Sequence, residues 1–206
     1  TSEVYPLEIT SAYATYSNNG VWCKPIAINR IVDRFGVTIK EYSPRREEVL
    51  SEETAYLVTD LLQSVVDNGT GGSARWKYKF THPAGGKTGT TQNWTDAWFV
   101  GFSPKIAVGV WFGVDDPKVS LGVNQSGSRA ALPVWAKFMK AAHDSMGWKP
   151  EKFTKPDGIS SQKICKISKL LPIRNCPVEN EIFITKYSPS QKCKVHTDGS
   201  LRRDRN

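Results

Sequence analysis

The chain has 206 residues, of which 39% are hydrophobic and 11% aromatic, a composition that excludes an intrinsically disordered protein. No apolar run reaches the roughly 20 residues that a membrane-spanning helix needs, and the length suits one domain with an appendage. The formal net charge of +8 is unevenly spread: 15 basic residues stand against 14 acidic ones up to Asp144, and 13 against 6 after it. A nearly neutral body with a basic tail does not favour a nucleic-acid partner.

The amino-terminal quarter predicts a helix and a hairpin. Pro6 begins the helix and the run Asn18-Asn19-Gly20 ends it, because proline suits a first turn and an Asn-Gly step stops a helix. Two β-branched runs at 26–32 and 37–42 flank a turn that contains glycine. That pattern is typical of a small hairpin outside the core.

The middle of the chain predicts a sheet covered by helices. Ser51 caps a second helix, whose apolar residues recur with helical spacing. The apolar runs 97–102 and 106–114 are continuous rather than alternating, which indicates strands that are buried on both faces. A further amphipathic helix is expected at 131–143. The expected class is therefore α/β, with helices on both sides of the sheet.

The pattern changes near Trp148. Prolines interrupt the rest of the chain, helical periodicity is lost, and only 181–185 looks like a strand. We therefore divide the chain into a body at 1–147 and a basic, cysteine-containing tail at 148–206.

One segment stands out as a candidate for chemistry: Gly85-Gly86-Lys87-Thr88-Gly89-Thr90-Thr91. Its Gly-Lys-Thr is similar to the end of a phosphate-binding loop, but that loop requires a glycine where Thr81 stands. No buried strand leads into the segment either, so nucleotide binding is not expected. By itself, Lys-Thr-Gly would be a solvated glycine-rich turn.

The residues around this segment indicate its function. Residues 86–113, together with 6–14, 55–71 and 127–135, resemble in the same order the transpeptidase domain of class A penicillin-binding proteins, the bifunctional enzymes that build bacterial peptidoglycan. The resemblance implies the fold of penicillin-recognising serine transpeptidases and β-lactamases, an α/β (α+β) architecture with an antiparallel sheet and helices on both faces. Residues 1–147 would be the C-terminal half of that domain.

The resemblance also implies roles for the Lys-Thr-Gly segment. Lys87 would assist proton transfer and add positive potential, and the hydroxyls of Thr88 and Thr90 would anchor the substrate carboxylate. Gly89 would let the substrate backbone approach, and the Thr90 N–H would be one of two oxyanion donors. Thr91 belongs to the same expected substrate-binding strand. Lys87 and Thr90 are thus the expected catalytic residues, and no metal or organic cofactor is required.

The family's other two motifs, Ser-x-x-Lys and Ser-x-Asn, have only accidental matches here. Ser160 with Lys163 lies in the polar tail, after the Lys-Thr-Gly segment instead of before it, and Ser17 lies at a helix end. We expect the nucleophilic serine upstream of Thr1, so this chain alone should not be acylated. Asp96 could be a catalytic carboxylate, but a structural role at the start of a strand is favoured.

The resemblance therefore predicts part of a serine-type D,D-transpeptidase that cross-links D-Ala-D-Ala stem peptides and binds β-lactams. The expected partners are those ligands, the rest of its own transpeptidase domain and an upstream glycosyltransferase domain, with a membrane contact only through an upstream anchor. The expected location is the extracytoplasmic face of the bacterial inner membrane. A D,D-carboxypeptidase or β-lactam hydrolase on the same fold is one alternative, and a β-lactam-binding sensor without turnover is another.

Three cysteines lie in the tail, together with a histidine. Cys165, Cys176 and Cys193, with His196, would supply the four ligands of a zinc site. Two observations argue against zinc. Cys165 and Cys176 are not in the closely spaced cysteine pairs typical of zinc ribbons, and the family works outside the cytoplasmic membrane, where disulfides form. We therefore expect a disulfide among the tail cysteines, with Cys23 as a buried free thiol or a fourth partner.

Overall fold

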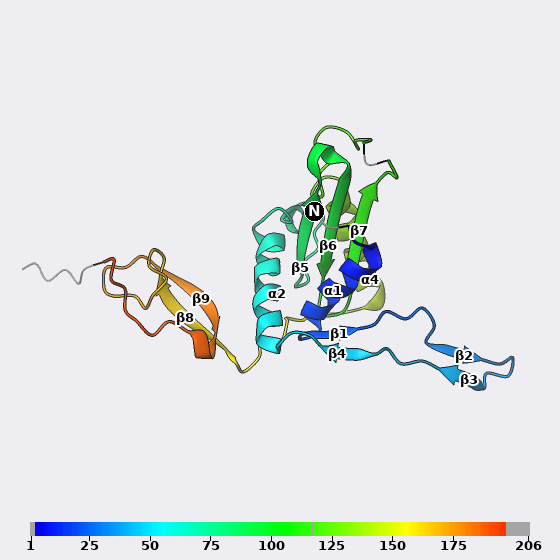
Figure 1. The fold of residues 1–206 in the computed structure, drawn as a ribbon, viewed down its shortest axis with the longest axis horizontal. Helices are drawn as coiled ribbons and strands as arrows, with labels where there is room; N and C mark the ends of the chain where they lie inside the picture. Colours follow the sequence, from blue (N-terminus) through cyan, green and yellow to red (C-terminus); the bar gives the residue numbers. More distant parts are fainter. Residues whose placement is uncertain (1–2, 117, 197–206) are drawn as a thin grey trace, which may run out of the picture. The chain divides into compact units, whose positions relative to one another are not determined.

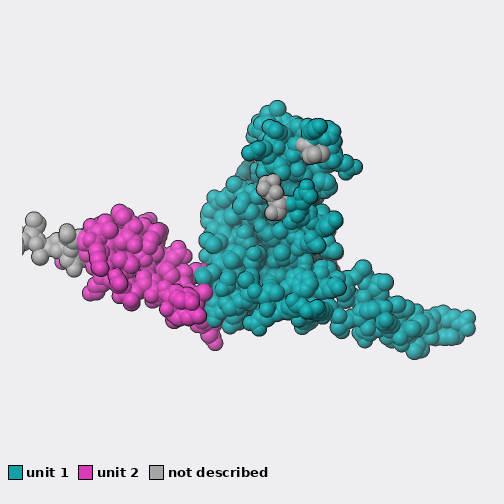
Figure 2. All heavy atoms as spheres, in the orientation of Figure 1, with its two compact units in different colours: residues 1–154 teal, residues 155–206 magenta. Residues whose placement is uncertain are grey.

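The computed structural model describes residues 3–116 and 118–196. The chain folds into two compact units, Thr1–Thr154 and Lys155–Asn206 (Figure 2). This division falls a few residues after the change of pattern near Trp148. Within the described ranges, no helix combines the length and apolar character needed to cross a membrane.

The first two helices begin where the sequence predicts. Helix α1 spans Pro6–Ser17, with the proline in its first turn. Helix α2 spans Glu52–Asp67, and the Ser51 hydroxyl accepts a hydrogen bond from the Thr54 N–H at 3.3 Å. That bond satisfies one of the N–H groups that the first turn of a helix leaves unpaired. Both predicted helices are confirmed.

The central sheet has three antiparallel strands in the order β5-β6-β7, at Gly85–Thr90, Asp96–Phe102 and Ala107–Gly113. Helix α4 spans Ala131–Met146 and is slightly longer than the predicted helix at 131–143. The two apolar runs are strands β6 and β7, as predicted. The strand β5 contains the Lys-Thr-Gly segment and pairs with β6 along its whole length.

Different helices cover the two faces of this sheet. On one face α1 approaches so closely that a Cβ on Gly109 would lie 2.2 Å from Thr10 Oγ1, a distance that only glycine permits. On the other face lies α4, whose Trp135 ring comes within 2.8 Å of the position a Cβ on Gly101 would take. Gly101 pairs with Val108, the residue before Gly109, so the two glycines face opposite sides. The predicted antiparallel sheet with helices on both faces is confirmed (Figure 1).

The main core lies between the sheet and α4. The ring centroids of Phe99 and Trp135 are 4.8 Å apart, and Phe80 packs edge-on against Trp135 at 5.6 Å. Leu132 and Met139 of α4 are fully buried beside them. Each aromatic ring removes roughly 150–250 Å² from water, so this cluster fixes β6 and, through it, β5.

Between α1 and α2 the chain forms an arm of two short ribbons (Figure 1). At the tip of the arm, β2 (Arg30–Val32) pairs with β3 (Thr38–Glu41), which confirms the predicted hairpin with shorter strands. At the base of the arm, β1 (Val21–Cys23) pairs with β4 (Arg46–Glu48). The sequence did not predict this second pairing, because a three-residue strand is too short to show an alternating pattern.

The second unit contains a two-stranded antiparallel sheet, in which β8 (Ile159–Cys165) pairs with β9 (Val178–Ile184). A short 3₁₀ helix, η2, follows at Thr185–Tyr187. The predicted strand at 181–185 overlaps β9, whereas β8 was missed. Its five central residues, Ser160 to Ile164, are mostly polar, and β-branched residues are few.

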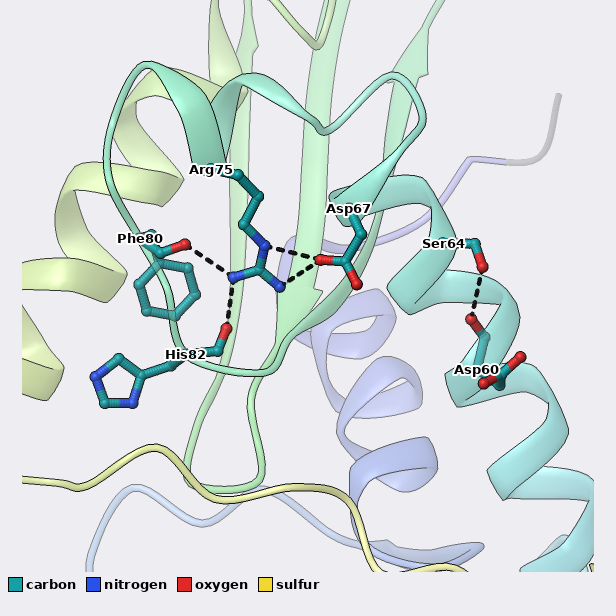
Figure 3. Close-up of polar contacts among 6 residues, drawn as sticks. All are labelled: Asp60, Ser64, Asp67, Arg75, Phe80 and His82. Atoms are coloured by element: carbon teal, nitrogen blue, oxygen red, sulfur yellow. Dashed lines mark hydrogen bonds and ion pairs between the residues drawn. The ribbon is translucent and has the colours of Figure 1, made fainter.

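Arg75 lies in the short helix α3 (Ser73–Trp76) and ties the end of α2 to the segment that leads into β5 (Figure 3). Its Nε and Nη2 atoms both lie 2.8 Å from Asp67 Oδ1. Its Nη1 donates to the Phe80 carbonyl at 2.8 Å and to the His82 carbonyl at 2.5 Å. One guanidinium group therefore satisfies a carboxylate and two carbonyls, and it fixes the approach of the chain to β5.

We predict that Arg75→Ala lowers the free energy of unfolding by about 2–4 kcal/mol, because it removes charge-assisted hydrogen bonds and leaves two carbonyls without a donor. Arg75→Lys keeps the charge but not the forked geometry, so its loss should be intermediate. Urea unfolding of the three proteins measures the difference. An Arg75→Ala variant as stable as the parent would contradict the role assigned to this side chain.

The pH dependence of stability should show the titration of His82, whose ring packs against those of Phe80 and His143 at centroid distances of 5.7 and 4.4 Å. Burial, and then the neighbouring His143, lowers the pKa of His82 below its ordinary value near 6.5. The unfolded chain thus binds this proton at higher pH than the folded chain does. The contribution of His82 to the free energy of unfolding therefore has its full value above about pH 6.5 and declines as the pH falls.

His82→Gln should make that decline shallower, which urea midpoints measured from about pH 8 to pH 5 would show. If parent and variant lose stability in parallel over this range, His82 does not titrate as proposed.

Candidate active site

Strand β5 is an edge strand, and no other strand pairs with its second edge in the described part of the chain. Just beyond it, the Thr91 N–H donates to the Asp96 carbonyl on the β6 side at 3.2 Å. Because successive residues in an antiparallel strand direct their backbone groups to opposite sides, the N–H and C=O groups of Thr88 and Thr90 point to the open edge. The edge thus offers donors and acceptors to an extended ligand.

Lys87 lies in the middle of β5, opposite Val100, and its side chain is exposed. Alternation along the strand places it on the face that α1 and α2 cover. Its Nζ donates to the Thr88 carbonyl at 2.9 Å, so the ammonium group reaches the open edge. None of the ion pairs found among the described residues involves Lys87, which leaves its charge available to an anionic ligand.

Thr88 and Thr90 share the opposite face, as their spacing of two predicts. Each hydroxyl already has a neighbour from outside the strand. Thr88 Oγ1 lies 2.9 Å from Thr70 Oγ1, and Thr90 Oγ1 accepts a hydrogen bond from the Gly127 N–H at 3.0 Å. The Thr90 hydroxyl keeps its own proton for donation to a ligand.

Gly127 brings the loop before α4 against the backbone of β5. A Cβ at this position would lie 2.2 Å from the Trp98 carbonyl oxygen and 2.5 Å from that of Gly89. Both are backbone atoms that cannot move aside, so the site requires glycine here. Gly89 itself is less crowded, because a Cβ there would lie 3.1 Å from Trp98 Cβ.

The turn after β5 is held by Asp96. Its Oδ1 accepts a hydrogen bond from Trp111 Nε1 at 2.8 Å, and its Oδ2 accepts from the hydroxyls of Thr91 and Thr95 at 3.3 and 3.2 Å. All of these partners belong to the turn and the neighbouring strand, which supports the structural role for Asp96. The short 3₁₀ helix η1 (Gln92–Trp94) forms the tip of the turn.

A cleft of about 780 Å³ opens beside this turn. It lies at the carboxyl end of β5. Polar and apolar residues line it, from the end of β5 and the turn that follows (Thr90, Thr91, Gln92, Thr95), from β6 and β7 (Asp96, Trp98, Trp111) and from the start of α1 and the residues just before it (Glu3, Val4, Pro6). A space of this size suits a peptide or a small-molecule ligand.

The two accidental motif matches lie away from β5. Ser160 is on β8 of the second unit, and its hydroxyl lies 2.9 Å from that of Ser188. Ser17 ends α1, where its hydroxyl donates to the Ala14 carbonyl at 3.0 Å. Neither serine lies at the amino-terminal end of a helix with the lysine one turn later, the geometry that the nucleophile motif would need. Both hydroxyls have local structural roles.

The disulfide predicted for the tail is wrong, because all four cysteines of the chain are unpaired thiols. Cys23 lies apart from the others in β1, half-buried. The remaining thiols gather around one histidine ring, with all four potential ligand atoms within 4.8 Å of one another. We call this group the Cys₃His cluster: Cys165, Cys176, Cys193 and His196.

The sequence identified the strand that carries the candidate site, but not the residues from other segments that form hydrogen bonds with it. Thr70 lies 18 residues before its hydrogen-bond partner Thr88, and Gly127 lies 37 residues after its partner Thr90. Both belong to stretches that carry the family resemblance, which was the only available signal. Nothing in their residue types indicated which hydroxyl each would meet. The catalytic roles of Lys87 and Thr90 stay predictions.

Comparison with known families agrees with this geometry. Residues 2–140 match the model of the penicillin binding protein transpeptidase domain, and residues 155–198 match that of the penicillin-binding protein 1A C-terminal domain. Penicillin-binding protein 1A of Aquifex aeolicus is 48% identical over 140 residues, 68% of this chain. The Clostridium tetani protein of the same name is 34% identical over 196 residues, 93% of this chain. The chain spans only 19% and 24% of these relatives' lengths.

Solved structures show the same fold. Penicillin-binding protein 1A from Haemophilus influenzae superposes with a TM-score of 0.83 at 24% identity, covering 92% of this chain and 33% of the other. The penicillin-binding protein PonA1 from Mycobacterium tuberculosis gives a TM-score of 0.63 at 25% identity, covering 73% and 40%. With an antiparallel sheet between helices, an open Lys-Thr-Gly edge and a family model matching well over half of its length, this chain belongs to the penicillin-binding protein transpeptidase family.

Proposed function

We propose that β5 and its surroundings form the substrate-anchoring side of a serine D,D-transpeptidase that cross-links the stem peptides of peptidoglycan. The observation that carries the proposal is the open edge of β5, where no strand pairs with the backbone of Thr88 and Thr90 and where the ammonium group of Lys87, which is in no ion pair among the described residues, lies against the Thr88 carbonyl. A stem peptide ending in D-Ala-D-Ala is an extended anion. Such a ligand can add to the strand edge and place its carboxylate near the positive charge.

The reaction is an acyl transfer in two steps. A serine hydroxyl attacks the carbonyl carbon of the penultimate D-alanine, the peptide bond breaks, and the terminal D-alanine leaves with the proton on its amine. The amine of a second stem peptide then attacks the ester and loses its proton, which restores the serine. We propose that the nucleophile belongs to a Ser-x-x-Lys motif elsewhere in a longer protein.

The residues of this chain stabilise the negative charges of the reaction and hold the substrate in position. The Thr90 N–H, which points to the open edge, stabilises the negative oxygen of the tetrahedral intermediate. The hydroxyls of Thr88 and Thr90 donate to the substrate carboxylate. The ammonium of Lys87 lowers the energy of both anions and assists proton transfer at the serine.

The wider setting is part of the same proposal. β-lactams acylate the same serine as stem-peptide mimics; PonA1 of Mycobacterium tuberculosis has been solved in complex with penicillin V. The relatives with which this chain aligns are about three and a half to four times as long, which leaves room for a glycosyltransferase domain and a membrane anchor. The protein would work on the extracytoplasmic face of the bacterial inner membrane, where its substrate is assembled.

We predict that Lys87→Ala slows acylation by a fluorescent penicillin at least about 100-fold in the intact protein that carries this chain, since it removes the charge at the strand edge. Lys137→Ala, on the exposed side of α4, is the matched control and should label at the parent rate. Labelling rates read from gels or stopped flow give the comparison. Equal rates for Lys87→Ala and the parent would refute the role of Lys87.

Thr90→Val should slow the same acylation by about 10–100-fold, since one charge-assisted hydrogen bond is worth roughly 1.5–3 kcal/mol. Valine preserves the shape but has no hydroxyl, and the Gly127 N–H also loses its acceptor. Thr90→Ser keeps the hydroxyl and should recover most of the rate. If serine and valine behave alike, carboxylate anchoring does not depend on this group.

Product analysis separates the proposal from its two rivals. With a stem pentapeptide and an amine acceptor, a transpeptidase forms the cross-linked product, a carboxypeptidase only the tetrapeptide and D-alanine, and a sensor neither. Mass spectrometry of the products distinguishes these outcomes. Release of D-alanine without cross-linking would overturn the proposed transpeptidase activity.

A further inference from the structure

The second unit has too small a core to account for its own fold. In the described part of this unit, the buried apolar side chains are those of Pro156, Ile159 and Ile164, together with the thiols of Cys165 and Cys193. Units of roughly 50 residues usually use disulfides, a metal or a partner to compensate for a small core. No disulfide is present. Another source of stability is therefore required.

The Cys₃His cluster brings together three separate backbone segments. Cys165 ends β8, and its N–H donates to the Leu170 carbonyl at 2.8 Å. Cys176 lies in the β8–β9 connection, where its sulfur accepts a hydrogen bond from the Ile173 N–H at 3.3 Å. Cys193 follows β9 and donates its N–H to the Leu171 carbonyl at 2.8 Å. A bond to one common centre would join all three segments.

Four of the six distances between the potential ligand atoms match a tetrahedral metal site, and the other two, from the Cys176 sulfur to the other sulfurs, are at most 4.8 Å. The Cys193 and Cys165 sulfurs are 3.7 Å apart. The Nδ1 atom of His196 lies 3.5, 3.4 and 3.3 Å from the sulfurs of Cys165, Cys176 and Cys193. A tetrahedral zinc ion with ordinary bond lengths separates two sulfurs by about 3.8 Å, and a sulfur from a nitrogen by about 3.5 Å.

We propose that the Cys₃His cluster binds one zinc ion that holds the second unit together. Binding releases the three thiol protons, so the ion is coordinated by three thiolates and the neutral imidazole through Nδ1. Four protein ligands fill a tetrahedral shell and leave no position for water, which makes the site structural and not catalytic. Thiolates with one imidazole select zinc over calcium and magnesium, which prefer oxygen ligands.

The surroundings suit such a site. Three thiolates and one zinc ion leave one negative charge. The N–H that Ile173 directs at the sulfur of Cys176 is a donor to a ligand sulfur and stabilises its thiolate form. This proposal is independent of the chemistry at β5.

The test measures metal and thiols in the full chain. After reduction, incubation with zinc chloride and extensive dialysis, elemental analysis should find one zinc per chain. Cobalt(II) in place of zinc should give the strong visible absorption of a tetrahedral thiolate site. Loss of zinc on dialysis would overturn the proposal, as would stoichiometric iron or copper in protein purified from cells. So would two thiols missing from purified protein with a mass lower by two hydrogens, which marks a disulfide.

Variants assign the ligands. Cys176→Ser should reduce retained zinc at least tenfold, whereas Cys23→Ser, the matched cysteine outside the cluster, should retain one zinc. His196→Cys keeps four ligands and should still bind zinc, with a shift of the cobalt spectrum toward four thiolates. Equal retention by Cys176→Ser and the parent would show that the zinc lies elsewhere. Because the cobalt spectrum of the parent needs no variant, misfolding of a variant does not obscure the result.

Discussion

Burial of the β5-β6-β7 sheet on both faces is the constraint on which the rest of the first unit depends. The helices come close enough only because the sheet has glycine where they touch it, at Gly109 beneath α1 and Gly101 beneath Trp135. Close packing on both sides fixes β6 within a dense aromatic core. Because β5 pairs with β6 in an unbroken register, its position follows from that core.

The candidate site uses the one side of β5 that the core leaves unpaired. Arg75 fixes the chain just before the strand, and Asp96 fixes the turn just after it. Thr70 and Gly127 meet the hydroxyls of the strand from two other segments. The polar groups at the open edge are therefore held before any ligand arrives, and such preorganisation is what stabilises developing charge most effectively.

The second unit reaches stability by a different route. Its sheet has two strands and little apolar surface to bury, so the packing that organises the first unit is not available to it. Instead, three thiols and an imidazole meet at one point. A metal at that point would replace a hydrophobic core by four strong bonds, which is a common solution in domains of this size.

The sequence by itself determined the helices α1, α2 and α4, the strands β6 and β7, and the segment carrying Lys87, since each depends on local signals such as the Ser51 cap or a continuous apolar run. It also named the four residues of the Cys₃His cluster, but not that they converge without disulfides. Only the tertiary structure decided that Thr90 meets Gly127 and that three distant thiols surround His196. Such contacts depend on how separate segments pack, and no local pattern of residues records that.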